Sequence, residues 1–196
     1  MNWKLKCLAL HALANTPGSA PIHRWLQRTV TGRYLDELSD SFLAAYIYHV
    51  QNFLKLPAPQ QSVALEFGAG RNLLTPLLLS AAGAKRIYAY DLVRLATVEQ
   101  INHIIRQLRE RAIPAGGQGW SEIKNIDHDL AGLYGIVYCA PADARDTNLP
   151  SGSVDFICST SMLEHIPSAD IVAILAECRR VSSRAGLVSF IIDYPA

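Results

Sequence analysis

The stretch Leu65-Glu66-Phe67-Gly68-Ala69-Gly70-Arg71-Asn72 decides the fold, because an apolar run ends there in two glycines and a helical pattern follows. Residues 63–67 are apolar except for Glu66, as in a strand buried on both faces. Glycines directly after such a strand let the backbone turn tightly and approach a ligand closely. The stretch therefore predicts a strand, a ligand-binding turn and a helix, which together open an α/β fold.

Short apolar runs and helical patterns alternate through the rest of the chain. The predicted strands are 63–67, 86–90, 136–139, 154–158 and 187–192. The predicted helices between them are 72–82, 97–112 and 169–181, with a short helix at 126–133 inside the irregular interval 114–135. Ile171, Ile174, Leu175 and Cys178 form the apolar stripe of the last helix. This alternation predicts a doubly wound, mostly parallel sheet of about five strands with helices on its faces.

Two helices are expected before the first strand, at 3–14 and 36–55. The apolar face of the second consists of Leu38, Phe42, Ala45, Tyr46, His49 and Phe53. We divide the chain into an N-terminal helical segment, 1–58, and a core, 59–196, within one domain. The aromatic residues of this segment could cover a ligand pocket, form part of a substrate site or only pack against the sheet. We expect the turn from Trp25 to Tyr34 to act as a lid and most of the others to pack.

Composition excludes several classes of protein. The chain has 196 residues, of which 50% are hydrophobic and 18% charged, with a net charge of +1. The apolar fraction is too high for disorder, no stretch is long enough for a membrane helix, and scattered basic residues do not favour nucleic acid. Four separated cysteines, Cys7, Cys139, Cys158 and Cys178, indicate reduced thiols in a cytoplasmic protein, and the histidines have no metal-ligand spacing.

A dinucleotide-binding turn would carry a third glycine at position 73, but that residue is Leu73. A nicotinamide-dependent oxidoreductase is therefore disfavoured. Glu66 within the strand is the second residue against that interpretation.

The segment Glu66-Phe67-Gly68-Ala69-Gly70 resembles motif I of the class I S-adenosylmethionine-dependent methyltransferases. The resemblance continues through Asp91 after the second strand, Asp143 after the third, the stretch 149–156, and Leu163-Glu164-His165-Ile166. It covers about residues 60–192 and implies the strand order 3-2-1-4-5. It also implies S-adenosyl-L-methionine as the cofactor.

The resemblance assigns cofactor contacts to ten residues. Asp91 would accept the ribose hydroxyls, and Asp143 would contact the adenine amino group. Asn72 replaces the third glycine of the motif, and it should tolerate the turn and cap the following helix. Glu66 is equally well explained as a ligand contact or as a structural carboxylate. The full set is Glu66, Gly68, Ala69, Gly70, Asn72, Asp91, Leu92, Asp143, Ala144 and Ser159.

The pair Glu164 and His165 follows the fourth strand, near the expected position of a methyl acceptor. Ser161 and Glu164 have the spacing of a capping box, which would explain Glu164 structurally. His165 could remove a proton from the acceptor as the catalytic residue, or it could be a packing histidine.

These observations predict direct methyl transfer to an O, N or C atom of a small-molecule acceptor. The alternative is a non-catalytic, methyltransferase-like module that binds cofactor or serves as a partner subunit. The family carries a C-terminal antiparallel hairpin after the fifth strand, and the sequence ends at Ala196 without it. We therefore expect a C-terminally truncated core whose apolar fifth strand promotes self-association.

Overall fold

The computed structural model describes residues 37–116 and 119–193. The helix expected at 3–14, the lid expected at 25–34 and Cys7 lie outside these ranges. The strands are β1 (Val63–Phe67), β2 (Arg86–Tyr90), β3 (Ile136–Cys139), β4 (Val154–Thr160) and β5 (Ser182–Ile191). The α-helices are α3 (Asp40–Phe53), α4 (Leu74–Ala81), α5 (Val98–Glu110), α6 (Ile126–Tyr134) and α7 (Ser168–Val181), and the short 3-10 helices are η2 (Pro59–Gln61) and η4 (Leu163–His165).

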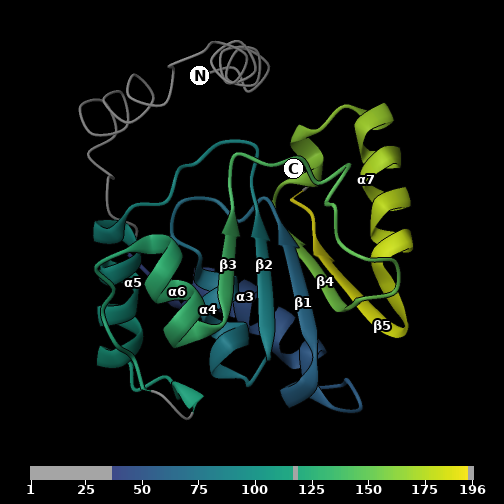
Figure 1. The fold of residues 1–196 in the computed structure, drawn as a ribbon. Helices are drawn as coiled ribbons and strands as arrows, with labels where there is room; N and C mark the ends of the chain where they lie inside the picture. The colour runs from purple at the N-terminus through teal and green to yellow at the C-terminus, as the bar shows by residue number, and fades with distance from the viewer. Residues whose placement is uncertain (1–36, 117–118, 194–196) are drawn as a thin grey trace.

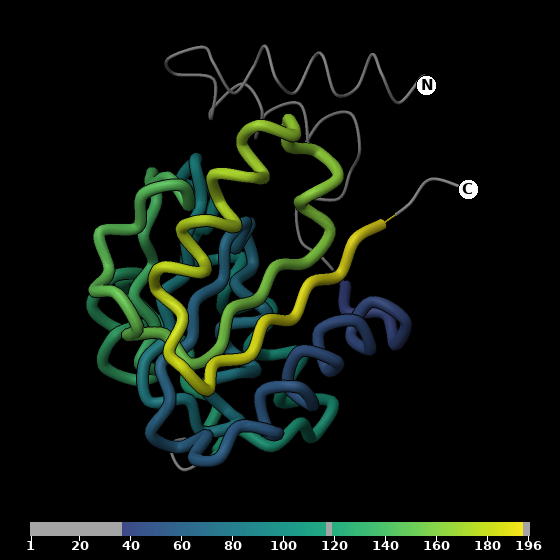
Figure 2. The backbone as a smooth tube through the Cα atoms, turned by 90° about the vertical axis from the view of Figure 1, so that its right-hand side faces the viewer, coloured from purple at the N-terminus to yellow at the C-terminus, as the bar shows by residue number. Residues whose placement is uncertain are grey.

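The five described strands form one parallel sheet in the order β3-β2-β1-β4-β5, as predicted. The helices α3 and α7 lie on opposite faces of this sheet, as the two views in Figures 1 and 2 show. The fold is therefore doubly wound. No helix of the described part is long and apolar enough to cross a membrane.

Strand alternation divides the core between these two faces. On β1, Ala64 packs in the cluster that contains the apolar residues of α3, α4 and α5, whereas Leu65 and Phe67 pack in the cluster of α7. Glu66 follows the parity of Ala64 and faces the α3 and α4 side. The same rule assigns Thr160 on β4 to that side, because Cys158 lies in the α3 cluster. Two polar side chains thus face one helical layer at the carboxyl ends of neighbouring strands.

Several boundaries and faces differ from the prediction. The helix α3 ends at Phe53 rather than at residue 55, and Phe42 is 37% exposed because it lies off the buried face made by Leu43, His49 and Phe53. In α7, Leu175 is 42% exposed, since Ile174, Cys178 and Val181 make the contact with the sheet. The predicted burial of Phe42 and Leu175 was wrong.

The last strand is longer and more polar than expected. β5 begins at Ser182, and its register against β4 shifts between the pairs Val154–Ser182 and Phe156–Leu187. The regular pairing begins at Leu187, which is the predicted start. Residues 182–186 add polar positions to the run predicted at 187–192, and Ser189 within that run is buried on the α3 side.

The junction between β1 and α4 contains a left-handed residue where the sequence has leucine. Leu73 is the N-cap of α4 with φ 51° and ψ 35°, and its side chain is fully buried. Asn72 was expected to take the unusual backbone conformation and to cap the helix. Instead its Oδ1 accepts a hydrogen bond from the Leu74 amide at 3.2 Å, one position before the left-handed residue. A β-carbon in the left-handed region costs about 1 kcal/mol, so core packing holds Leu73 in a strained conformation.

We predict that this strain reverses the usual order of alanine and glycine. Leu73→Ala and Leu73→Gly both lose a buried side chain, but glycine relieves the strain, so Leu73→Gly should be the more stable variant by about 1 kcal/mol. Leu77 is a matched control because it is fully buried inside α4. There Leu77→Gly should be less stable than Leu77→Ala by about 1 kcal/mol. Urea unfolding of all four variants measures both differences; the same order at both positions would contradict the prediction.

Candidate functional site

The glycine loop after β1 is held by the end of β2. Asp91 accepts hydrogen bonds from the Gly70 amide at 2.9 Å and from the Val93 amide at 3.1 Å. The Ala69 amide donates to the Tyr90 carbonyl at 3.0 Å. Burial raises the pKa of Asp91, and the amides that donate to it oppose the rise. Asp91 thus serves as the anchor of the loop, with carboxylate lone pairs left for a further donor.

The two glycines of the loop have different reasons to be there. Gly68 has φ 74°, and a β-carbon on it would lie 2.4 Å from the Met162 sulfur. Gly70 has φ 68° with open space around it, so its backbone conformation alone favours glycine. The loop therefore presents backbone without side chains toward the carboxyl end of the sheet.

A pocket of about 280 Å³ lies beside this loop. It is lined by Phe42, Tyr46, Glu66, Gly68, Ala69, Gly70, Arg71, Asn72, Leu74, Thr75 and Thr160. Five of the predicted contacts meet there, namely Glu66, Gly68, Ala69, Gly70 and Asn72. The other five do not line it.

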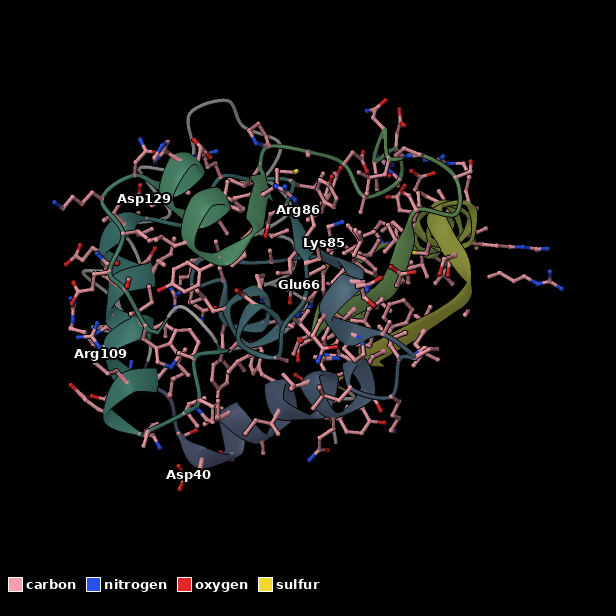
Figure 3. All side chains as sticks on the ribbon, turned by 60° about the horizontal axis from the view of Figure 1, so that its bottom comes forward. Asp40, Glu66, Lys85, Arg86, Arg109 and Asp129 are labelled. Atoms are coloured by element: carbon pink, nitrogen blue, oxygen red, sulfur yellow. The ribbon has the colours of Figure 1, made fainter. Side chains whose placement is uncertain are left out.

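Glu66 is the unusual group of the pocket. It lies inside the molecule among the strands, whereas Asp40 lies at the periphery (Figure 3). No described residue hydrogen bonds to its Oε2 atom, which is buried. Burial raises the pKa of Glu66 to about 8, and the negative charge of Asp91 adds to the rise. A buried carboxyl oxygen without a partner is costly, so the Oε2 atom of Glu66 is suited to receive a hydrogen-bonding or cationic group of a ligand.

The predicted contacts Leu92, Asp143, Ala144 and Ser159 lie outside the lining of the pocket. Asp143 is engaged by Arg145, whose Nε and Nη2 atoms lie 2.9 and 2.6 Å from Asp143 Oδ2. Arg145 also contacts Asp170 of α7 at 2.5 Å, and it lowers the pKa of Asp143. Leu92 is 60% exposed, whereas Ala144 and Ser159 are buried.

The segment after β4 corrects one interpretation. Ser161 and Glu164 do not form a capping box: Ser161 has φ 49°, the segment makes only the 3-10 turn η4, and α7 starts later, at Ser168. The Oε2 atom of Glu164 is buried without a hydrogen-bond partner among the described residues. His165 is exposed, with its Nε2 4.0 Å from Glu164 Oε1.

Four of the lining residues were not predicted as site residues, namely Arg71, Leu74, Thr75 and Thr160. Phe42 and Tyr46 were expected mainly to pack against the sheet. Thr160 could have been found by parity, because β4 extends two residues beyond its predicted end and places residue 160 on the Glu66 side. Phe42 and Tyr46 form a tilted ring pair 4.8 Å apart. The aromatic wall of the pocket thus comes from α3.

We predict that Glu66 makes the protein less stable as the pH rises. Its pKa is about 8 when folded and near 4.5 when unfolded, so the folded state binds more protons between these values. Glu66 should therefore lower the free energy of unfolding by roughly 1 kcal/mol per pH unit, and this contribution acts unopposed by the buried His49 above about pH 6.5. Glu66→Gln should remove this slope, whereas the control Glu122→Gln, at an exposed ion pair with Arg106, should keep it. Denaturant titrations at pH 5 to 8 decide this, and equal slopes in wild type and Glu66→Gln would refute it.

Residues 120–190 match the family described as "Methyltransferase domain". The matched part contains β3, β4, α7 and most of β5 but not the glycine loop. No curated protein matches the sequence significantly.

Many solved structures match the fold. A SAM-dependent methyltransferase of Leishmania major is 18% identical, with a TM-score of 0.51, over 96% of this chain and 60% of that one. A protein of Galdieria sulphuraria assigned as a sarcosine dimethylglycine methyltransferase is 19% identical, with a TM-score of 0.51, over 79% and 49% of the two chains. One of Methanococcus maripaludis assigned as an S-adenosyl-L-methionine-dependent methyltransferase is 13% identical, with a TM-score of 0.50, over 88% and 61%.

This chain thus spans less than two thirds of the length of these proteins. At these identities the likeness concerns the fold, including the strand order of the sheet. Residues 120–190 thus resemble a methyltransferase domain, and the described part of the chain has the fold of S-adenosylmethionine-dependent methyltransferases.

Proposed function

We propose that the protein binds S-adenosylmethionine at the glycine loop and transfers its methyl group to an O, N or C atom of a small-molecule acceptor. The observation that carries the proposal is the pocket at the carboxyl end of β1, where the glycine backbone adjoins the buried Glu66, whose Oε2 atom has no hydrogen-bond partner among the described residues. Open α/β sheets bind ligands at this edge. S-adenosylmethionine, when bound, supplies a methyl group on a positively charged sulfur.

The residues of the pocket suit the parts of that molecule. Glu66 could accept the ammonium group of the amino-acid tail, directly or through water, and this would compensate its desolvation. Gly68, Ala69, Gly70 and Asn72 would provide the close backbone contact. Asp91 would hold the ribose hydroxyls with the lone pairs that its amide contacts leave unused.

The proposal extends to the outer part of the site. Leu92, Ala144 and Ser159 would border the nucleoside. Asp143 would contact the adenine amino group, and in doing so it would have to share or release Arg145. Methyl transfer is a direct displacement, so the main work of the protein is to align acceptor and methyl group. For an oxygen or nitrogen acceptor, the exposed His165 is the proposed base and would pass its proton to water.

The rival proposal is a module that binds cofactor without turnover. A calorimetric titration combined with a turnover assay using labelled cofactor and a set of small acceptors separates the two proposals. Binding with methyl transfer supports the enzyme, binding alone across the set supports the module, and tighter binding of NAD would overturn both.

We predict that Asp91→Asn weakens the binding of S-adenosylhomocysteine by about tenfold to a hundredfold, because a charged acceptor of hydroxyls and loop amides is lost. The control Asp127→Asn changes an exposed carboxylate that pairs with Arg94 at 2.7 Å, and it should bind as wild type does. Calorimetry measures both affinities, and thermal melting checks that the variants fold. Unchanged affinity in Asp91→Asn would assign the ribose to another residue.

We further propose cytoplasmic localisation, and self-association through β5, which pairs with β4 alone among the described strands. Leu187 and Val188 on this strand are 36% and 52% exposed. Val188→Lys should lower the apparent mass at high protein concentration, since charge on an edge strand opposes pairing. Val172→Lys, on exposed α7, is the control. Light scattering that shows a monomeric wild type at all concentrations would refute self-association.

A further inference from the structure

A continuous chain of buried polar groups ends at the pocket. His49 of α3 is fully buried, with Nδ1 2.8 Å from Ser189 Oγ on β5 and Nε2 3.0 Å from Thr160 Oγ1 on β4. Thr160 lines the pocket together with Glu66. One imidazole therefore connects a hydroxyl inside the protein with a hydroxyl at the pocket wall.

The outer end of the chain determines the direction of its hydrogen bonds. Lys55 Nζ lies 2.7 Å from Asn52 Oδ1, and an ammonium group can only donate. This contact orients the Asn52 amide so that its Nδ2 donates to Ser189 Oγ at 2.9 Å. The Ser189 hydroxyl proton then has one acceptor among the described hydrogen bonds of this group, which is His49 Nδ1.

The tautomer of His49 follows from that direction. A neutral imidazole carries one proton, so Nδ1 as acceptor leaves the proton on Nε2, which donates to Thr160 Oγ1. Burial lowers the pKa of His49 to about 4, which keeps the ring neutral near pH 7. Thr160 Oγ1 accepts this bond, so its own hydroxyl proton is available to another acceptor. The described hydrogen bonds of Thr160 include no acceptor for that proton.

We propose that this chain orients the Thr160 hydroxyl as a hydrogen-bond donor to the carboxylate of the cofactor's amino-acid tail, with His49 as a positioning residue. The inference rests on the proposed function, because it places the tail in the pocket beside Glu66. The chemistry is complementary: Glu66 faces the ammonium group, while Thr160, aided by the Arg71 side chain on the pocket wall, faces the carboxylate.

The first test measures the tautomer. Long-range nitrogen–proton correlation spectra of protein labelled with ¹⁵N-histidine distinguish a protonated Nε2 from a protonated Nδ1. The signals of His49 are identified by their loss in His49→Gln. A protonated Nε2 and a bare Nδ1 at pH 7 are expected; a protonated Nδ1 would reverse the chain and overturn the inference. This result does not depend on cofactor binding.

The second test measures the carboxylate contact with two ligands. S-adenosylhomocysteine carries the tail, whereas 5′-methylthioadenosine lacks both its carboxylate and its ammonium group. Thr160→Val should weaken S-adenosylhomocysteine binding about tenfold, as expected for a lost bond to a charged group. It should leave 5′-methylthioadenosine unchanged, and Thr160→Ser should restore binding to within about twofold.

The outcomes separate the inference from the function on which it rests. If wild type binds neither ligand, the proposed function fails, whatever the tautomer. If wild type binds both and Thr160→Val weakens both equally or neither, the cofactor carboxylate is not the partner of Thr160 and the inference fails alone. His49→Gln retains an amide donor and should bind S-adenosylhomocysteine more tightly than His49→Phe, with melting curves as the check on folding. Equal affinities in these two variants would also count against the role of His49.

Discussion

The hydrogen bond from the Gly70 amide to Asp91 links the ends of the two central strands, and the site depends on it. Parallel pairing brings β1 and β2 to the same edge, but it leaves the loop after β1 free to take many paths. A half-buried carboxylate at the end of β2 selects the path on which the Gly70 amide points toward it. The same carboxylate raises the cost of ionising Glu66 nearby. Asp91 therefore shapes the loop and also adds to the effect of burial on Glu66.

Strand alternation explains how residues distant in sequence meet at this pocket. Glu66, Thr160 and Ser189 lie on three different strands and face the same layer of helices. Helix α3 contributes His49, which hydrogen bonds to Thr160 and Ser189. Its earlier residues Phe42 and Tyr46 line the pocket. An element that precedes the sheet in sequence thus provides both a wall of the pocket and a polar support beneath it.

The sheet and much of the loop could be predicted from sequence because the information is local. Short apolar runs located β1, β2 and β3 to the residue, and the resemblance in sequence implied the strand order that the sheet has. Features that depend on tertiary packing could not be predicted. The core holds Leu73 in a left-handed conformation that local preference would assign to Asn72, and the turn at Ser161 breaks an apparent capping box. Likewise, periodicity alone could not tell that the apolar faces of α3 and α7 are rotated away from Phe42 and Leu175.

Arg145 forms ion pairs with both Asp143 and Asp170, and this affects how the neighbouring elements respond to a ligand. It joins the loop after β3 to the first turn of α7 through one guanidinium group, and all three residues are partly exposed. A ligand group that draws Asp143 away from Arg145 would leave the guanidinium group to Asp170 alone. The same loop would stay joined to α7 through Thr147, whose amide and hydroxyl donate to Glu177 Oε1 at 2.8 and 2.6 Å. Occupation of the outer site would therefore move Arg145 toward the start of α7 without releasing the helix. Salt in the buffer, which screens exposed ion pairs, would instead weaken both contacts of Arg145 together.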